Sequence, residues 1–257
     1  MLIKLTNLIK KYNLDIIGVS HFGAHLGQEV SVYKELNIKN IHLFEPQKNL
    51  YSVLEEKFSD DSDISLYNFG LRDEEKSEKL NLSPENNGLS ASILKPQKHK
   101  DLYPDIKFIG TEEVAIKIYD KLKIEKVNFL NIDIQGYELF ALKGSLETLK
   151  KDIDYIFIEV NREEFYQGNV LVNELDEFLE KLSFIRVETK WVNRFIQWGD
   201  ALYIKKDNLN KQTIYKAKIT KFLESFYFYY LFIDLFRLFY RLKYKTKQYL
   251  KNFISGK

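Results

Sequence analysis

Eight polar side chains follow apolar stretches of the sequence, at points where buried strands would end. They are His21, His25, Glu45, Asn68, Asp133, Gln135, Glu159 and Asn161. The carboxyl ends of parallel strands meet at one edge of a sheet, and ligands bind in the crevice beyond that edge. A carboxylate or imidazole in such a crevice can take a proton from a substrate hydroxyl. We therefore expect a general base among Asp133, Glu159 and His21, in that order.

A glycine turn within residues 15–46 has the form of a cofactor-binding unit. A short apolar run predicts a buried strand, and Gly23 and Gly27 allow a sharp turn with a ligand close to the backbone. Apolar residues at helical spacing follow the turn. Glu45 ends the next apolar strand, 18 residues after Gly27, where a carboxylate can accept hydrogen bonds from a ribose. The unit predicts an adenosine-containing cofactor.

Several of these residues also have purely structural interpretations, which the sequence leaves open. Glu45 could stabilise the N-terminus of the helix that follows it, and Asp133 could cap a later helix. Residues 68–71 could form an ordinary turn at the end of a strand. A single histidine is more often structural than catalytic, and this applies to both His21 and His25.

Helical and strand-like patterns alternate along most of the chain. Strand patterns cover residues 16–19, 41–44, 62–69, 112–119, 127–132, 154–160, 184–189 and 201–204, and helical patterns cover residues 1–14, 30–36, 48–58, 137–146 and 171–182. This alternation predicts an α/β fold with a mostly parallel sheet. Residues 80–110 hold three of the four prolines and predict a long ordered loop or a small added hairpin.

Charge divides the 257-residue chain into two parts. Residues 205–257 contain 13 Lys/Arg and 3 Asp/Glu, which leaves 26 and 34 for the first 204 residues. We expect one domain over residues 1–208 and a basic, aromatic, helical tail over residues 209–257. The absence of cysteine excludes disulfides and cysteine nucleophiles, and residues 1–14 lack the apolar core of a secretory signal. These features favour a cytoplasmic protein, associated with a membrane at most through its surface.

Several short motifs follow one another in a definite order. They are GAHLGQE at 23–29, EP at 45–46, NGLSASIL at 87–94, His99 with YP at 103–104, NIDIQGYEL at 131–139 with LKG at 142–144, EVN at 159–161 and WGDALY at 198–203. In order and spacing they resemble the FkbM-type methyltransferases, a family of S-adenosylmethionine-dependent enzymes with a Rossmann-like fold. The resemblance extends over roughly residues 13–205.

The resemblance implies a three-layer α/β/α fold whose seven-stranded sheet ends in an antiparallel strand. It also implies binding of S-adenosylmethionine and O-methylation, with a sugar or glycan hydroxyl as the favoured acceptor. The cofactor-binding residues would be Gly23, Ala24, His25, Gly27, Gln28, Glu45, Pro46, Asn68, Gly70 and Leu71, and the substrate-binding residues Gln135 and Asn161. No metal is expected, because the sulfonium of the donor is already an activated leaving group.

The chain departs from the family pattern at the glycine turn. Many relatives have an acid before the turn and an asparagine inside it, whereas this chain has His21 and His25. The side chain that would hold the methionine end of the cofactor therefore stays open.

Residues 221–251 combine an aromatic, apolar run with a following basic segment. The uninterrupted part, residues 226–233, is too short to span a bilayer, and Asp234 and Arg237 interrupt any longer span. Aromatic rings beside Lys and Arg suit the surface of an anionic membrane. Packing on the domain and self-association as a homo-oligomer are the competing interpretations, and nucleic acid is the least favoured partner.

Two other functions compete with methyl transfer. A nicotinamide-dependent sugar oxidoreductase uses a similar strand, glycine turn, helix and acid, but its catalytic Tyr-x-x-x-Lys pair is not found in a fitting place. A catalytically inactive Rossmann-like scaffold, recruited by the tail to a membrane or a partner, is the alternative outside the enzymes.

Overall fold

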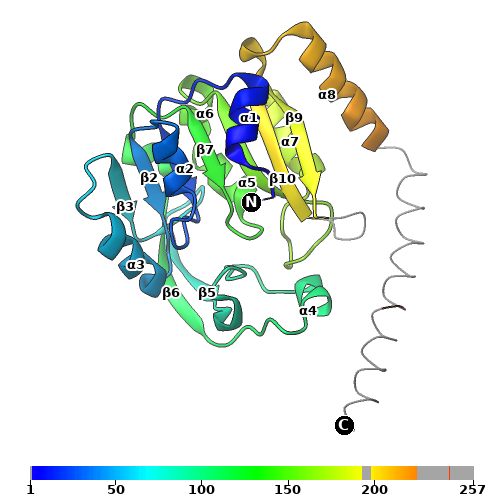
Figure 1. Ribbon diagram of the computed structural model, residues 1–257. Coiled ribbons are helices and arrows are strands. Elements are labelled where there is room, and N and C mark those ends of the chain that lie inside the picture. Colours follow the sequence, from blue (N-terminus) through cyan, green and yellow to red (C-terminus); the bar gives the residue numbers. More distant parts are fainter. Residues whose placement is uncertain (1, 193–197, 225–242, 244–257) are drawn as a thin grey trace.

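The central sheet has seven strands in the order β3-β2-β1-β7-β8-β10-β9 (Figure 1). The structure is a computed structural model and describes residues 2–192, 198–224 and 243. The strands are β1 (Val19–Phe22), β2 (Ile41–Phe44), β3 (Ile64–Tyr67), β7 (Phe129–Ile132), β8 (Tyr155–Asn161), β9 (Phe184–Trp191) and β10 (Trp198–Lys205). Neighbouring strands from β3 to β8 are parallel, and β10 is antiparallel to both β8 and β9. The expected mostly parallel sheet with an antiparallel last strand is confirmed.

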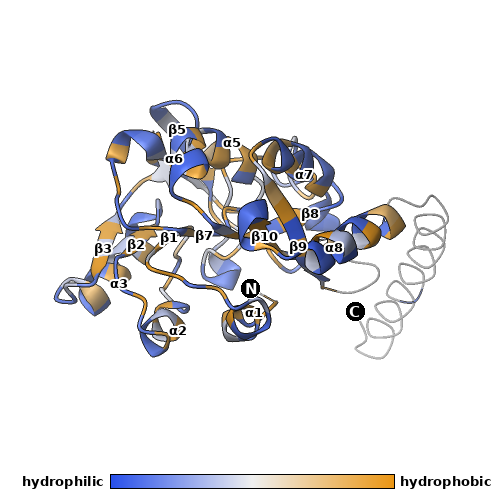
Figure 2. Cartoon of the chain, turned by 90° about the horizontal axis from the view of Figure 1, so that it is seen from above, coloured by the Kyte–Doolittle hydropathy of each residue, from blue (hydrophilic) through white to orange (hydrophobic). Residues whose placement is uncertain are grey.

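Helices cover both faces of this sheet, as the view from above shows (Figure 2). One face carries α1 (Leu5–Tyr12), α2 (Val30–Glu35) and α3 (Lys48–Phe58), and the other carries α5 (Glu138–Lys143), α6 (Leu146–Lys151) and α7 (Val172–Lys181). Each face has its own apolar core, because the central strands are buried on both sides. The chain therefore has the three layers that the sequence predicted.

The helices form where apolar residues recur at helical spacing. In α7, Val172, Leu175 and Leu179 are buried, and Glu174 accepts a hydrogen bond from the backbone N–H of Leu171 at 2.8 Å, which caps the first turn. The interval 137–146, expected as one helix, is instead split between α5 and α6. A Cβ at Gly144 would lie 2.0 Å from the backbone oxygen of Arg72.

A second, smaller sheet lies beside the carboxyl edge of the main one. It contains β4 (Gly70–Leu71), β6 (Thr111–Lys117) and β5 (Lys76–Asn81), in that order. The strand expected at 112–119 thus belongs to this sheet, and the charged stretch 72–79 contributes a strand that the sequence did not predict. Between β5 and β6 run the short helices η1 (Pro84–Asn86) and α4 (Lys98–Leu102). The irregular segment 82–110 is therefore ordered.

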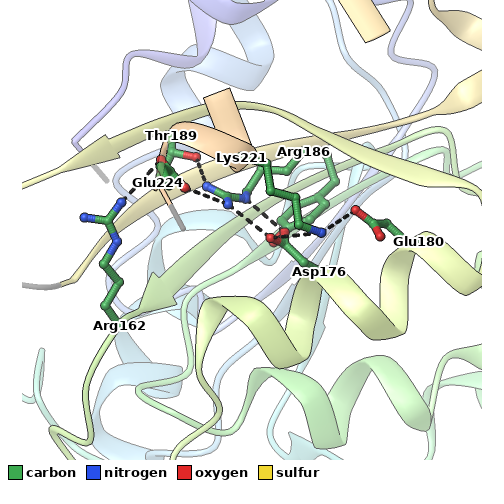
Figure 3. A network of polar contacts seen from close by, with 8 residues as sticks. Arg162, Asp176, Glu180, Arg186, Thr189, Lys221 and Glu224 are labelled. Atoms are coloured by element: carbon green, nitrogen blue, oxygen red, sulfur yellow. Dashed lines mark hydrogen bonds and ion pairs between the residues drawn. The ribbon is translucent and has the colours of Figure 1, made fainter. Parts of the chain in front are cut away.

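The first part of the expected tail is helix α8 (Lys211–Glu224), which follows the turn η3 (Lys206–Asn208). Figure 3 shows how side chains of α8 reach the body: Glu224 pairs with Arg186 of β9 at 2.8 Å and with Arg162 at 3.3 Å. The aromatic and basic remainder of 221–251 lies outside the described residues, apart from Lys243. Within the described ranges, no helix is both long and apolar enough to cross a bilayer.

Candidate functional site

The glycine turn after β1 joins the ends of three neighbouring strands. Gly23 has a φ of +82°, and a Cβ there would lie 2.0 Å from the backbone oxygen of Asp133, directly after β7. The N–H groups of Gly23 and Ala24 both donate to the carbonyl of Phe44 at the end of β2, each at 2.9 Å. Only glycine can bring the turn this close to β7, so the backbone of the turn borders the space beyond the strands.

Three further residues hold the turn in place through contacts within the protein: Gly27, Ala24 and Gln28. Gly27 has a φ of +72°, and a Cβ there would lie 2.6 Å from the ring of Phe58 on α3. Ala24 is fully buried in the core beneath α2. The amide nitrogen of Gln28 lies 2.8 Å from Nδ1 of His25. None of the three lines the cleft described below, and the contacts that the structure shows for them are made within the protein.

His25 connects the turn to the segment that covers the cleft. Its backbone is left-handed, with a φ of +49°, and its Nε2 lies 2.8 Å from the carbonyl oxygen of Asn87. A carbonyl only accepts, so Nε2 carries the proton and Nδ1 accepts from Gln28. His25 lines the cleft.

Glu45 lies directly after β2 and is almost completely buried. Its two oxygens accept hydrogen bonds from the backbone N–H groups of His25, at 2.9 Å, and Gln47, at 2.8 Å. Burial raises the pKa of Glu45 to about 7, and these two hydrogen bonds oppose the rise. The side chain of Gln47 also stabilises the charged form, and of the four lone pairs on the two oxygens one still remains for a ribose hydroxyl.

Residues 68–71 form the opposite side of the cleft. The amide of Asn68 donates to the backbone oxygens of Glu45, at 2.9 Å, and Pro46, at 3.2 Å, so it positions the acid rather than lining the cleft. Gly70 and Leu71 line the cleft together with Pro46. A Cβ at Gly70 would lie 2.8 Å from the side chain of Ile116. This side is apolar, as suits the face of an adenine ring.

These elements enclose a cleft of about 720 Å³, counting the part that is open to solvent. Predicted residues on its wall are Gly23, His25, Glu45, Pro46, Gly70, Leu71, Asp133 and Gln135. Residues Gly88, Leu89, Ala91 and Ile93 of the irregular segment also line it. A buried acid, a glycine turn and an apolar slot fit the ribose, the amino-acid part and the adenine of S-adenosylmethionine respectively.

A second pocket adjoins this cleft and encloses about 830 Å³, again counting open space. Asp133, Gln135 and Leu89 line both pockets. The remaining walls are Ser90, His99, Tyr103, Ile106, Glu159, Asn161, Phe165, Tyr166 and Trp198. Five of these are aromatic or imidazole rings, and burial lowers the pKa of His99 to about 4, so that its ring is neutral. The second pocket suits an acceptor with flat, weakly polar faces.

Gln135 connects two candidate bases: Asp133, which follows β7, and Glu159, which lies on β8. Its amide nitrogen donates to Asp133 Oδ1 at 2.7 Å and to Glu159 Oε2 at 3.1 Å, while its amide oxygen accepts from the hydroxyl of Tyr166 at 3.0 Å. Asn161 Nδ2 lies 3.5 Å from the other oxygen of Glu159. The structure therefore brings Asp133, Gln135, Glu159 and Asn161 together, as the strand-end argument predicted.

Glu159 is buried in a group of carboxyl groups. Burial raises its pKa well above the usual value, and the charges of Asp133, Glu138 and Asp200 raise it further. Burial also raises the pKa of Glu138 to about 7 and that of Asp200 to about 6. Neither acid was predicted as a site residue, although both belong to the motifs quoted above. A carboxylate with a raised pKa is a stronger proton acceptor, as general-base catalysis requires.

His21 occupies a different environment from the other strand-end residues. Its Nδ1 lies 3.2 Å from the hydroxyl of Tyr33, which accepts a hydrogen bond from Asn131 at 2.6 Å. His21 is buried within β1 and lines neither pocket. Burial lowers its pKa, so it is neutral at physiological pH. In this position His21 contacts Tyr33 and borders neither pocket, so the geometry gives no support to its choice as a third candidate base.

Within the described residues, no group of three or more His, Cys, Asp or Glu side chains has an arrangement that could hold a metal ion. Residues that the sequence argument missed include His99, Tyr103, Tyr166 and Trp198, which line the second pocket. Three of them stand in or beside quoted motifs, but Tyr166 follows no strand pattern and no motif, and only the folded chain brings it to Gln135.

The comparisons with known proteins agree with this geometry. A model of the methyltransferase FkbM domain matches residues 21–186. The structure resembles a methyltransferase FkbM from Methylobacillus flagellatus, with a TM-score of 0.50, 13% identity and coverage of 73% of this chain and 43% of that one. The chain thus spans less than half of that relative. Among curated proteins, no sequence matches the chain.

Two further solved structures are similar at lower scores. Magnesium protoporphyrin IX methyltransferase from Synechocystis, solved with S-adenosylmethionine, has a TM-score of 0.44 and 9% identity over 78% of this chain and 75% of that one. A Burkholderia thailandensis 1,6-didemethyltoxoflavin-N1-methyltransferase, solved with S-adenosylhomocysteine, has a TM-score of 0.43 and 10% identity, with 79% and 76% coverage. The domain match covers most of the chain and includes every residue that lines the two pockets except Trp198. The chain therefore belongs to the FkbM family of S-adenosylmethionine-dependent methyltransferases.

Proposed function

We propose that the chain transfers the methyl group of S-adenosylmethionine to a hydroxyl of a sugar or glycan, with Glu159 as the general base. One observation carries the proposal: a buried carboxylate of raised pKa lines an aromatic pocket that adjoins the cofactor cleft. The two pockets share Asp133 and Gln135. A methyl group in the cleft would therefore face an acceptor in the pocket across these residues.

The residues of the cleft would divide the cofactor between them. Glu45 would accept hydrogen bonds from the ribose hydroxyls, and Gly70 and Leu71 would contact the adenine. The backbone at Gly23 and the side chain of His25 border the part of the cleft nearest Asp133. The cofactor supplies a methyl group on a sulfonium, which leaves as a neutral thioether.

The composition of the second pocket supports an acceptor that is a neutral sugar. Its rings offer faces for the C–H groups of a sugar, and Glu159 and Asn161 offer polar atoms for its hydroxyls. Among the described residues that line it, none is Lys or Arg, while Asp133 and Glu159 are acidic. A phosphate or carboxylate on the acceptor would meet repulsion here without a compensating cation.

Glu159 would take the hydroxyl proton while the acceptor oxygen forms its bond to the methyl carbon and the bond from carbon to sulfur breaks. The charges balance, because the cationic sulfonium becomes neutral and the carboxylate becomes a carboxylic acid. Asp133 is shared by the two pockets and lies close to where the methyl group would be transferred. We place Glu159 ahead of Asp133 because burial and the neighbouring carboxylates raise its pKa, while its second oxygen has only a long contact, with Asn161.

Two measurements test this function. Calorimetry with S-adenosylmethionine should detect binding, and Glu45→Ala should weaken it. Tritium from the labelled methyl group should then transfer to members of a panel of neutral glycosides and polysaccharides, and not to their phosphorylated counterparts. Absence of binding would favour the inactive scaffold, and preferential transfer to the phosphorylated sugars would contradict the neutral acceptor.

The organisation of the remaining chain stays a prediction. We infer one methyltransferase domain over residues 1–208 and a basic tail over 209–257, with membrane contact through residues 221–251. Cytoplasmic localisation and self-association are likewise inferred from the sequence alone. Flotation with anionic liposomes of the full chain against a chain ending near Asn208 tests the membrane contact, and equal flotation of both would contradict it.

A further inference from the structure

We propose that Gln135 is a positioning residue for the general base: its amide bridges the carboxylates of Asp133 and Glu159 and leaves one oxygen of Glu159 for the acceptor. The proposal rests on the proposed function, in which Glu159 takes the hydroxyl proton. It changes the role that the sequence indicated for Gln135, which was contact with the substrate.

The backbone at this position is unusual. Gln135 has a φ of +52°, and Gly136, which follows it, has a φ of +97°. A left-handed conformation is costly for a residue such as glutamine and persists where the surrounding structure requires it. A Cβ at Gly136 would lie 2.7 Å from the side chain of Asn169, so the turn is tightly packed. The tight packing therefore fixes the backbone from which the side chain of Gln135 projects.

The hydrogen-bonding groups of the Gln135 amide are already engaged within the protein. Both N–H groups are used, because the nitrogen contacts Asp133 at 2.7 Å and Glu159 at 3.1 Å. The amide oxygen lies 3.0 Å from the hydroxyl of Tyr166, whose single proton is shared with the carbonyl of Ser90, also at 3.0 Å. Ionised carboxylates only accept hydrogen bonds, so the nitrogen must face them. An amide with both N–H groups engaged has none left for a substrate, whereas it can fix the distance between two like charges.

The bridge also acts on the protonation of Glu159. The titratable groups around this carboxylate are Asp133 after β7, Glu138 on α5, Asp200 on β10, and the phenols of Tyr103 and Tyr166. The negative charges of the three carboxylates favour the protonated form of Glu159. The neutral phenols do not change its protonation. The Gln135 N–H is a donor to the charged form, which it stabilises. It therefore keeps Glu159 ionised at pH values where burial alone would protonate it.

Two variants remove the bridge in different ways. Gln135→Asn keeps an amide and suits a left-handed backbone, but its side chain is one methylene too short to reach both carboxylates. Gln135→Met keeps the length and removes the polar atoms. Ser92→Ala is the matched control, because the Ser92 hydroxyl donates to the backbone oxygen of Gln135 at 2.7 Å and does not involve the amide.

The test is a carbon-13 NMR titration of glutamate carboxyl groups in the full-length protein. The signal of Glu159 is identified by its loss in Glu159→Gln. We expect both Gln135 variants to raise the titration midpoint of Glu159 by about one pH unit, since the charged form loses a donor. Ser92→Ala should leave the midpoint unchanged. An unmoved midpoint in folded Gln135→Asn would overturn the proposal.

Activity provides an independent readout once an acceptor is found in the glycoside panel. The acid limb of the pH profile for kcat/KM should move to higher pH in Gln135→Asn by the same shift. A raised KM with an unmoved limb would instead identify Gln135 as a substrate contact. The NMR titration needs no acceptor, so a moved midpoint in a chain that transfers no methyl group would reject the proposed function and retain the bridge.

Discussion

Carboxylates are buried in two regions of this molecule, and the groups that surround them differ between the two. Beyond the carboxyl ends of the sheet, Asp133, Glu138 and Glu159 lie close together, with Gln135 bridging two of them. Between β9, α7 and α8, Asp176 lies in a network with two arginines and a lysine (Figure 3). In the first region a neutral amide contacts the carboxylates, and in the second region cations contact them.

In the ion-pair network, the carboxylates of Asp176 and Glu224 each have more than one protein donor. Arg186 donates from Nε and Nη2 to the two oxygens of Asp176 at 2.9 and 3.0 Å, and the hydroxyl of Tyr203 donates to the same carboxylate at 2.8 Å. Glu224 of α8 accepts from Arg186 at 2.8 Å. The guanidinium of Arg162 also stacks on Trp191, 3.9 Å from the ring centre. Both oxygens of Asp176 are engaged by protein donors, and Asp176 lines neither pocket, so we assign the network a structural role.

The carboxyl groups at the strand ends lie in a different environment from those of the network. Burial raises the pKa values of Glu138 and Glu159. The contrast shows that burial of an acid does not by itself indicate catalysis. What distinguishes the candidate site is an acid buried without a cation and beside a pocket.

The largest effect expected is on catalysis. Glu159→Gln keeps the shape of the side chain but removes the proton acceptor, so kcat should fall by about 10²–10⁴. Tritium transfer measures this, and calorimetry should find unchanged S-adenosylmethionine binding. If Glu159→Gln keeps the wild-type rate, Asp133 becomes the base to examine, through Asp133→Asn.

The second effect is on stability and lies in the ion-pair network. Arg186→Met leaves Asp176 buried beside Glu224 without its main cation, which should cost about 3–5 kcal/mol of unfolding free energy. Urea denaturation measures this loss. Adding Asp176→Asn to Arg186→Met should recover part of it, because the uncompensated charge is then removed. A loss of less than about 1 kcal/mol would mean that the network behaves as a surface ion pair.

The third effect is the dependence of stability on pH. Glu45 and Glu138 have native pKa values of about 7, above the ordinary 4.5, so the native state binds more protons than the unfolded chain between these values. The unfolding free energy should therefore fall as pH rises from about 5 to 8, by about 5 kcal/mol for the two groups together.

Urea denaturation at a series of pH values measures this slope. Glu138→Gln should flatten it, because one of the protons that distinguish the two states is removed. Stability that rises with pH over this interval would show that the buried acids are paired with cations, as in the network around Asp176.

The sequence predicted the strands and the turn that form the site, because local patterns determine these elements. The apolar strands, the glycine turn and Glu45 follow directly from periodicity and spacing, and so does the meeting of Asp133 with Glu159. The sequence did not reveal that Gly27 packs against Phe58, since a turn glycine looks the same whether a ligand or a ring approaches it.

The remaining differences arise from contacts between distant segments. Tyr166 reaches Gln135 across 31 residues of sequence, and β5 forms only because β6 pairs with it. His21 stands near a strand end like Glu159, but it is buried against Tyr33 and lines neither pocket. A strand-end position predicts the edge of the sheet at which a residue lies, and the partner side chains decide whether it faces a ligand.

The smallest effect expected concerns the helix that begins the tail. Glu224→Gln removes the charge that joins α8 to Arg186, while Asp176 still holds this arginine. Glu224 is about four-fifths buried, with 18% of its side chain exposed, so the loss should be about 1 kcal/mol in urea denaturation. Methyl transfer should be unchanged, since Glu224 lines neither pocket. If Glu224→Gln lowers the rate without lowering stability, the tail communicates with the acceptor pocket through Arg162, which follows Asn161 directly in the chain, and the two regions are then coupled rather than separate.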